Sequence, residues 1–146
     1  VVVYPMLDKT NAASGGFPNG TDGASSSDTR YATATGDQLV IANALYQSQP
    51  VDALVIVCAP VAQPVDFTIA DLGTGNTVAN QTLIKSALTD MFLRLSAPGG
   101  TIHPNNWDEA LSALNLSTFS VSQPTGPVTG ANAAATLVLG TITFES

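Results

Sequence analysis

The side chains most able to do chemistry are few in this chain, and the single histidine is the first of them. His103 lies between Ile102 and Pro104, and a serine–histidine–aspartate triad would have to use it. The sequence has no Gly-x-Ser-x-Gly turn, which would present a nucleophilic serine at the end of a strand. We therefore expect His103 to be a loop or helix-entry residue without a catalytic task.

Metal ligands and phosphate loops are equally sparse. A zinc site usually takes three or four His, Cys or carboxylate ligands, and Cys58 is the only cysteine beside the one histidine. Cys58 lies in the apolar run 54–59, so we expect a small buried residue and no intrachain disulfide. A phosphate-binding GxxxxGK[ST] loop is absent.

Oxygen donors crowd residues 8–35, a segment rich in Gly, Ser, Asn, Asp and Thr. Such donors could bind calcium, but their spacing does not match an EF-hand loop. We expect a long, exposed and solvated loop, and loops of this length are often functional or mobile. The donors are Asp8, Asn11, Asn19, Asp22 and Asp28.

Other carboxylates could form pairs for acid–base catalysis, namely Asp66, Asp71, Asp108 and Glu109. The last two fall in the first turn of an expected helix, where negative charge suits the helix dipole. Capping and solubility account for these acids. Trp107 is expected to anchor its helix in the core, with a subunit contact as the alternative. The sequence thus predicts no catalytic, cofactor-binding or metal-ligating residue, and no enzyme.

Charge and composition restrict the partners. The formal net charge is -7, and the basic residues Lys9, Arg30, Lys85 and Arg94 are scattered. Binding to nucleic acid requires clustered Lys and Arg side chains, and so does binding to an anionic membrane surface. We therefore expect neither. No apolar run reaches the roughly 18 residues of a membrane span. Charged residues are only 10% of the chain, against about a quarter in typical soluble domains. This composition indicates a chain that normally sits among protein partners.

Apolar periodicity predicts three elements in the first half. A β-branched run predicts a strand over residues 1–7, with Pro5 at an edge or bulge. Because the chain opens in this run without a methionine, we expect a fragment that starts within a strand. A helix is expected over 37–46, with Asp37 as its N-cap and an apolar stripe facing the core. A buried strand is expected over 52–59. The stripe consists of Val40, Ile41, Ala44 and Leu45.

The second half shows clearer patterns. Alternation predicts a strand at 65–70, and helical spacing predicts an amphipathic helix at 77–95. Short elements follow: a strand at 101–102, a helix capped by Asn105 or Asn106, and a strand near 119–121. A last strand, 137–144, has an expected bulge at Gly140. The predicted class is α+β, with two small β-α-β type lobes, mostly antiparallel sheets and helices packed on one face. The lobes are residues 1–60 and 61–146.

Several motifs, taken in order, resemble baseplate J-like proteins of contractile phage tails. In the second half they resemble the C-terminal domain of that family: the junction Pro60–Ile69, the helix end Asp90–Arg94 running into Ala97–Ile102, the helix Trp107–Leu111, and the final Leu139–Phe144. The first half is similar to the preceding segment of the same family, through Val1–Leu7, Asp37–Tyr46 and the junction Gln49–Ala53. The resemblance covers nearly the whole chain.

This resemblance implies a structural role in the baseplate wedge and no catalytic residues. The implied partners are other baseplate and tail proteins, together with copies of the chain around the tail axis, without nucleic acid or membrane insertion. The implied location is the virion, with the host cytoplasm during assembly. The alternative function is an independent binding module that recognises a cell-surface glycan through residues 8–35. A hydrolase that uses His103 is a third, weaker hypothesis.

Overall fold

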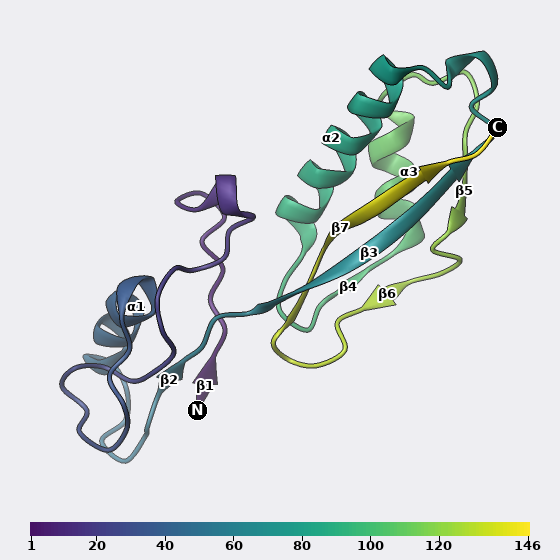
Figure 1. Ribbon diagram of the computed structural model, residues 1–146. Coiled ribbons are helices and arrows are strands. Elements are labelled where there is room, and N and C mark those ends of the chain that lie inside the picture. Colours follow the sequence, from purple (N-terminus) through teal and green to yellow (C-terminus); the bar gives the residue numbers. More distant parts are fainter. The chain divides into compact units, whose positions relative to one another are not determined.

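The computed structural model describes residues 1–146, and the chain forms two compact units (Figure 1). We call Val1–Val61 the N-terminal unit and Ala62–Ser146 the C-terminal unit. Both contain helix and strand in small mixed sheets, which confirms the predicted α+β class. None of the helices combines the length and the apolar character that a membrane crossing requires.

The strands of the N-terminal unit are shorter than expected. β1 covers only Val2–Val3 and pairs in parallel with β2, Ile56–Val57. The predicted strand over 1–7 is therefore wrong in extent, because Pro5 has no N–H to continue a ladder. The predicted strand over 52–59 is also shorter than expected, since only Ile56–Val57 form it. The second edge of β2 pairs with Gly23, through backbone hydrogen bonds in both directions with Val57.

Most of residues 8–35 are exposed, as their composition predicts, but the segment is not solvated throughout. Ala24 and Ala34 are fully buried. The Ala24 N–H donates to the Ala32 carbonyl, and the Ala34 N–H donates to the Ala24 carbonyl. A short 3-10 turn covers Ala12–Ser14. Small side chains let backbone segments approach closely enough to satisfy one another's polar groups, so this polar segment forms much of the interior of its unit.

Helix α1 covers Gly36–Tyr46, and two predictions about it are wrong. Its N-cap is Thr35, because the Asp37 carboxylate is turned toward the preceding segment and accepts hydrogen bonds there. Its buried residues are Gln38 and Ala42, whereas Val40 of the predicted stripe is 70% exposed. The helix is oriented by these polar contacts, so the apolar stripe does not set its buried face.

The C-terminal unit has a three-stranded sheet in the order β5-β3-β7. β3 is Val61–Ala70, β5 is Ser120–Gln123 and β7 is Ala135–Phe144. β5 is antiparallel to β3, whereas the arrows of β3 and β7 run the same way in Figure 1. Antiparallel pairing is thus less dominant than expected, because the chain returns to β3 through a long helical crossover. A small antiparallel sheet joins β4, Thr101–Ile102, to β6, Val128–Thr129.

Two helices cover this sheet. The 3-10 turn Gly73–Gly75 leads into α2, Val78–Leu95, whose N-cap Thr77 accepts the Asn80 N–H. Helix α3 covers Pro104–Ser112, and its N-cap is His103. The predicted caps Asn105 and Asn106 lie inside the helix because Pro104 suits its first position. The Asn106 side chain accepts the His103 N–H at 2.9 Å.

The core of the C-terminal unit lies between the sheet and the helices. Apolar residues alternate on β3 as predicted, and Ile84, Leu88, Met91 and Phe92 of α2 join the same core, whereas Leu95 at the end of the predicted stripe is 43% exposed. On β7 the residues packed against the core shift from Leu139 to Ile142, one residue out of strict alternation. The recorded register shift lies between Thr68 and Ile69 of β3, and the bulge at Gly140 stays a prediction. The fully buried members are Phe67, Ile69, Leu72, Ile84, Leu88, Met91, Ile102, Trp107, Leu111 and Leu137.

Candidate functional site

The side chains that could do chemistry are dispersed over the chain. No three His, Cys, Asp or Glu side chains meet at a spacing that could hold a metal ion. His103 is exposed at the start of α3. Cys58 is half-buried, and its burial, with a smaller effect of the Asp22 carboxylate, raises the pKa of the thiol. A thiol that resists ionisation is a poor nucleophile.

Three of the oxygen donors predicted in residues 8–35, Asn11, Asp22 and Asp28, form side-chain hydrogen bonds. The Asp22 carboxylate accepts the Ala59 N–H at 2.8 Å. The Asp37 carboxylate accepts the Asn19 N–H and the Asn11 side-chain amide, and these bonds lower the pKa of Asp37. These contacts tie one backbone segment to another, and no three carboxylate, His or Cys side chains meet there as metal ligands.

The predicted acids of the C-terminal unit make separate contacts and do not gather into a metal site. Asp66 accepts the Thr141 N–H at 2.8 Å, next to Gly140 of β7. Asp71 accepts the Ser120 hydroxyl at 2.6 Å. Asp108 and Glu109 are exposed in α3. Trp107 is 2% exposed, which confirms the prediction that it anchors its helix in the core.

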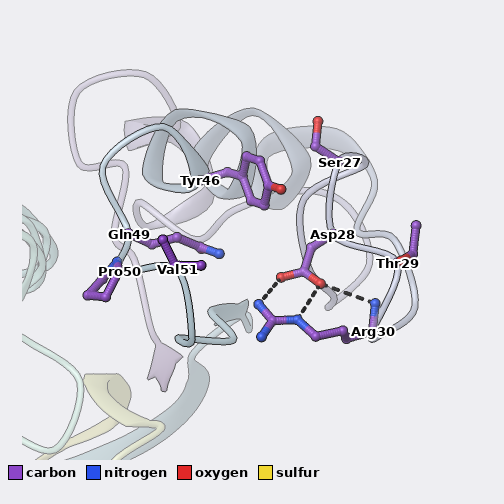
Figure 2. A pocket seen from close by; sticks show the side chains of 8 residues that line it. All are labelled: Ser27, Asp28, Thr29, Arg30, Tyr46, Gln49, Pro50 and Val51. Carbon is purple, nitrogen blue, oxygen red and sulfur yellow. Dashed lines mark hydrogen bonds and ion pairs between the residues drawn. The ribbon is translucent and has the colours of Figure 1, made fainter.

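A hollow of about 460 Å³ lies beside an ion pair in the N-terminal unit (Figure 2). The Asp28 carboxylate faces the Arg30 guanidinium, with N–O distances of 2.7 and 2.9 Å. The same guanidinium donates to the carbonyls of Asp52 and Ala53. The polar atoms of Asp28 and Arg30 thus form hydrogen bonds within the unit. Through Arg30, the ion pair connects residues 28–30 to the turn before β2. Glycan recognition by this segment stays a prediction.

The ion pair has an electrostatic consequence. The hydrogen bonds from Arg30 lower the pKa of Asp28 from 3.8 to about 2. The folded chain therefore binds fewer protons than the unfolded chain between these pH values, and stability rises with pH there. The contribution is complete above about pH 4 and is lost as the pH falls through about 2. Asp37 acts in the same direction.

We expect Asp28→Asn to destabilise the N-terminal unit at pH 6 and to flatten its acid dependence between pH 4 and pH 2. Urea unfolding of the chain at a series of pH values, followed by amide signals of this unit, measures both. Asp8→Asn removes the same charge from an exposed side chain of the same unit, away from the contacts of Arg30, and is the matched control. Parallel curves for wild type and Asp28→Asn would contradict this role of the pair.

A second hollow, of about 480 Å³, lies in the C-terminal unit between one flank of α2 and the last part of β7. Its helical side carries the cation Lys85 and the 80% exposed Val78. Its strand side carries the apolar residues Ile142 and Phe144. We call this feature the β7 groove. The lining residues are Val78, Gln81, Thr82, Lys85, Gly140, Thr141, Ile142 and Phe144.

Sequence reasoning missed both hollows. Arg30 and Lys85 entered the prediction only as scattered cations. A local signal existed for the first, since Asp28 and Arg30 are two residues apart and can share a turn. No local signal existed for the β7 groove, because its two sides are more than 50 residues apart in the sequence. Comparisons with protein-family models and with curated proteins gave no match.

Proposed function

We propose that the chain is a structural, non-enzymatic component of a contractile phage tail baseplate and acts by packing against other tail proteins. The observation that carries the packing part of this proposal is the β7 groove, which adjoins a strand edge without a neighbour in its sheet. The baseplate part rests on the ordered motifs that resemble baseplate J-like proteins.

The distribution of ionisable groups supports the same proposal. The acids and the histidine do not converge, and several carboxylates hold backbone segments together instead. A chain of this kind can act through the shape and bonding capacity of its surface. The proposed partners are other baseplate and tail proteins and copies of the chain around the tail axis. The proposed location is the virion, with the host cytoplasm during assembly.

The test is deletion of the codons for residues 1–146 in the virus or prophage that carries them. We expect particles without assembled baseplates in negative-stain electron microscopy, because the wedge would lack one of its packing surfaces. The intact gene supplied on a plasmid should restore the baseplates and serves as the control. Complete, contractile tails in the deletion strain would refute the proposed function.

A further inference from the structure

β7 leaves part of one edge of its sheet open. It is the last strand in the order β5-β3-β7 (Figure 1). The Glu145 N–H donates to the Ile69 carbonyl of β3 at 2.8 Å. Backbone groups alternate in direction along a strand, so those of Phe144 and Ile142 face away from β3. These two residues can therefore bond to a further strand.

The beginning of β7 is already occupied. The Gly99 N–H donates to the Ala135 carbonyl at 2.8 Å, and the Ser96 hydroxyl donates to the Leu137 carbonyl. The segment after α2 thus covers residues 135–137. The open stretch is residues 138–144, and the β7 groove lies beside its last five residues.

Nothing in the sequence of the open stretch protects it from pairing. Proteins usually block a free strand edge with proline, with charged side chains or with a covering segment. Residues 138–144 read VLGTITF and contain neither proline nor charge. An unblocked edge of this kind is a suitable template for strand addition.

The positive charge of Lys85 in the β7 groove indicates which kind of segment would bind there. Arg30 and Arg94 are paired with Asp28 and Asp90, whereas Lys85 forms no salt bridge. A carboxylate on an added strand would pair with Lys85 at the rim of the groove. A second copy of the chain is less suitable, because each copy carries a net charge of -7 and the two would repel.

We propose that an extended segment of a partner protein adds to β7 as a fourth strand and directs a carboxylate to Lys85. Its α2-facing side chains alternate with solvent-facing ones. Those on either side of the carboxylate are apolar and cover Val78 and Phe144. Identifying this partner as a tail protein rests on the proposed function, whereas strand addition itself does not.

The test uses the 146-residue chain and the capped heptapeptide Thr-Val-Thr-Glu-Thr-Val-Thr, whose alternate residues provide the apolar and acidic face. Isotope-labelled protein is titrated and its amide signals are followed by NMR. We expect shifts at Ile142 and Phe144. We expect binding at least about ten-fold tighter than for the same peptide with Lys in place of Glu. Two peptides N-methylated at alternate residues provide a further control. The one that lacks the N–H groups facing β7 should not bind, whereas the one that lacks the outward-facing N–H groups should still bind.

Two charge variants distinguish the contribution of Lys85 from that of the open edge of β7. Lys85→Glu should reverse the preference between the Glu and Lys peptides, whereas Lys9→Glu makes the same charge change in the N-terminal unit and should leave it unchanged. Absence of binding, equal binding of both peptides, or shifts away from β7 would overturn the inference. So would dimerisation through the same amides without peptide, which would assign the edge to a second copy.

The two proposals fail separately. Peptide binding is measured on the chain alone, so its failure leaves the deletion experiment unaffected. Intact tails after deletion would refute the baseplate function, while strand addition to β7 would still stand on the titration.

Discussion

Replacing Trp107 by alanine is expected to lower the unfolding free energy of the C-terminal unit by about 3–5 kcal/mol. The indole is almost completely buried and meets the Phe67 ring edge-to-face, with centroids 5.6 Å apart at 86°. Phe67 in turn meets the Phe92 ring at 6.0 Å. The substitution removes one end of this aromatic chain and leaves a cavity between α3 and β3. Since domains are stable by only about 5–15 kcal/mol, the loss is large.

Urea unfolding, followed by the methyl signals of Leu88 and Leu111, measures this effect because both side chains are fully buried in the C-terminal unit. Leu83→Ala is the control: its side chain is 49% exposed on α2, and we expect a loss of about 0.5 kcal/mol. Trp107→Phe retains a ring beside Phe67 and should lie between the two. A Trp107→Ala protein as stable as Leu83→Ala would contradict the assignment of Trp107 as the anchor of α3.

Gly36→Ala is expected to destabilise the N-terminal unit by about 2–4 kcal/mol. Gly36 has φ +60, and an added Cβ would collide with the backbone carbonyl oxygen of Asn19. That carbonyl accepts the Asp37 N–H at 2.9 Å, while the Asn19 N–H donates to the Asp37 carboxylate at 2.8 Å. The substitution would therefore separate the start of α1 from the segment that it holds.

Gly73→Ala provides the comparison that isolates the collision. Gly73 has φ +51, but nothing lies within 4 Å of an added Cβ, so only the backbone preference of about 1–2 kcal/mol is lost. Urea unfolding resolved by unit, with hydrogen exchange at the Asn19 amide, measures both effects. Equal losses for the two variants would show that the contact between Asn19 and the start of α1 contributes little.

The sequence alone determined the elements whose apolar pattern is local and strong. The alternation of Val65, Phe67 and Ile69 predicted β3, and the stripe from Ile84 to Leu95 predicted α2, because a side chain's face follows from its position along a strand or helix. The α+β class and the burial of Trp107 followed from the same patterns. These elements account for most of the C-terminal core.

Tertiary structure alone decided how residues 8–35 pack, which face of α1 is buried, and how β7 runs. In the N-terminal unit the deciding contacts are polar and join distant residues, such as Asp37 with Asn19 and Asp22 with Ala59. Hydrophobic periodicity carries no information about such pairs. The β7 groove likewise exists only because a long crossover places β7 beside β3 and under a flank of α2. Its two sides are separated along the chain, so no local pattern could indicate that they meet.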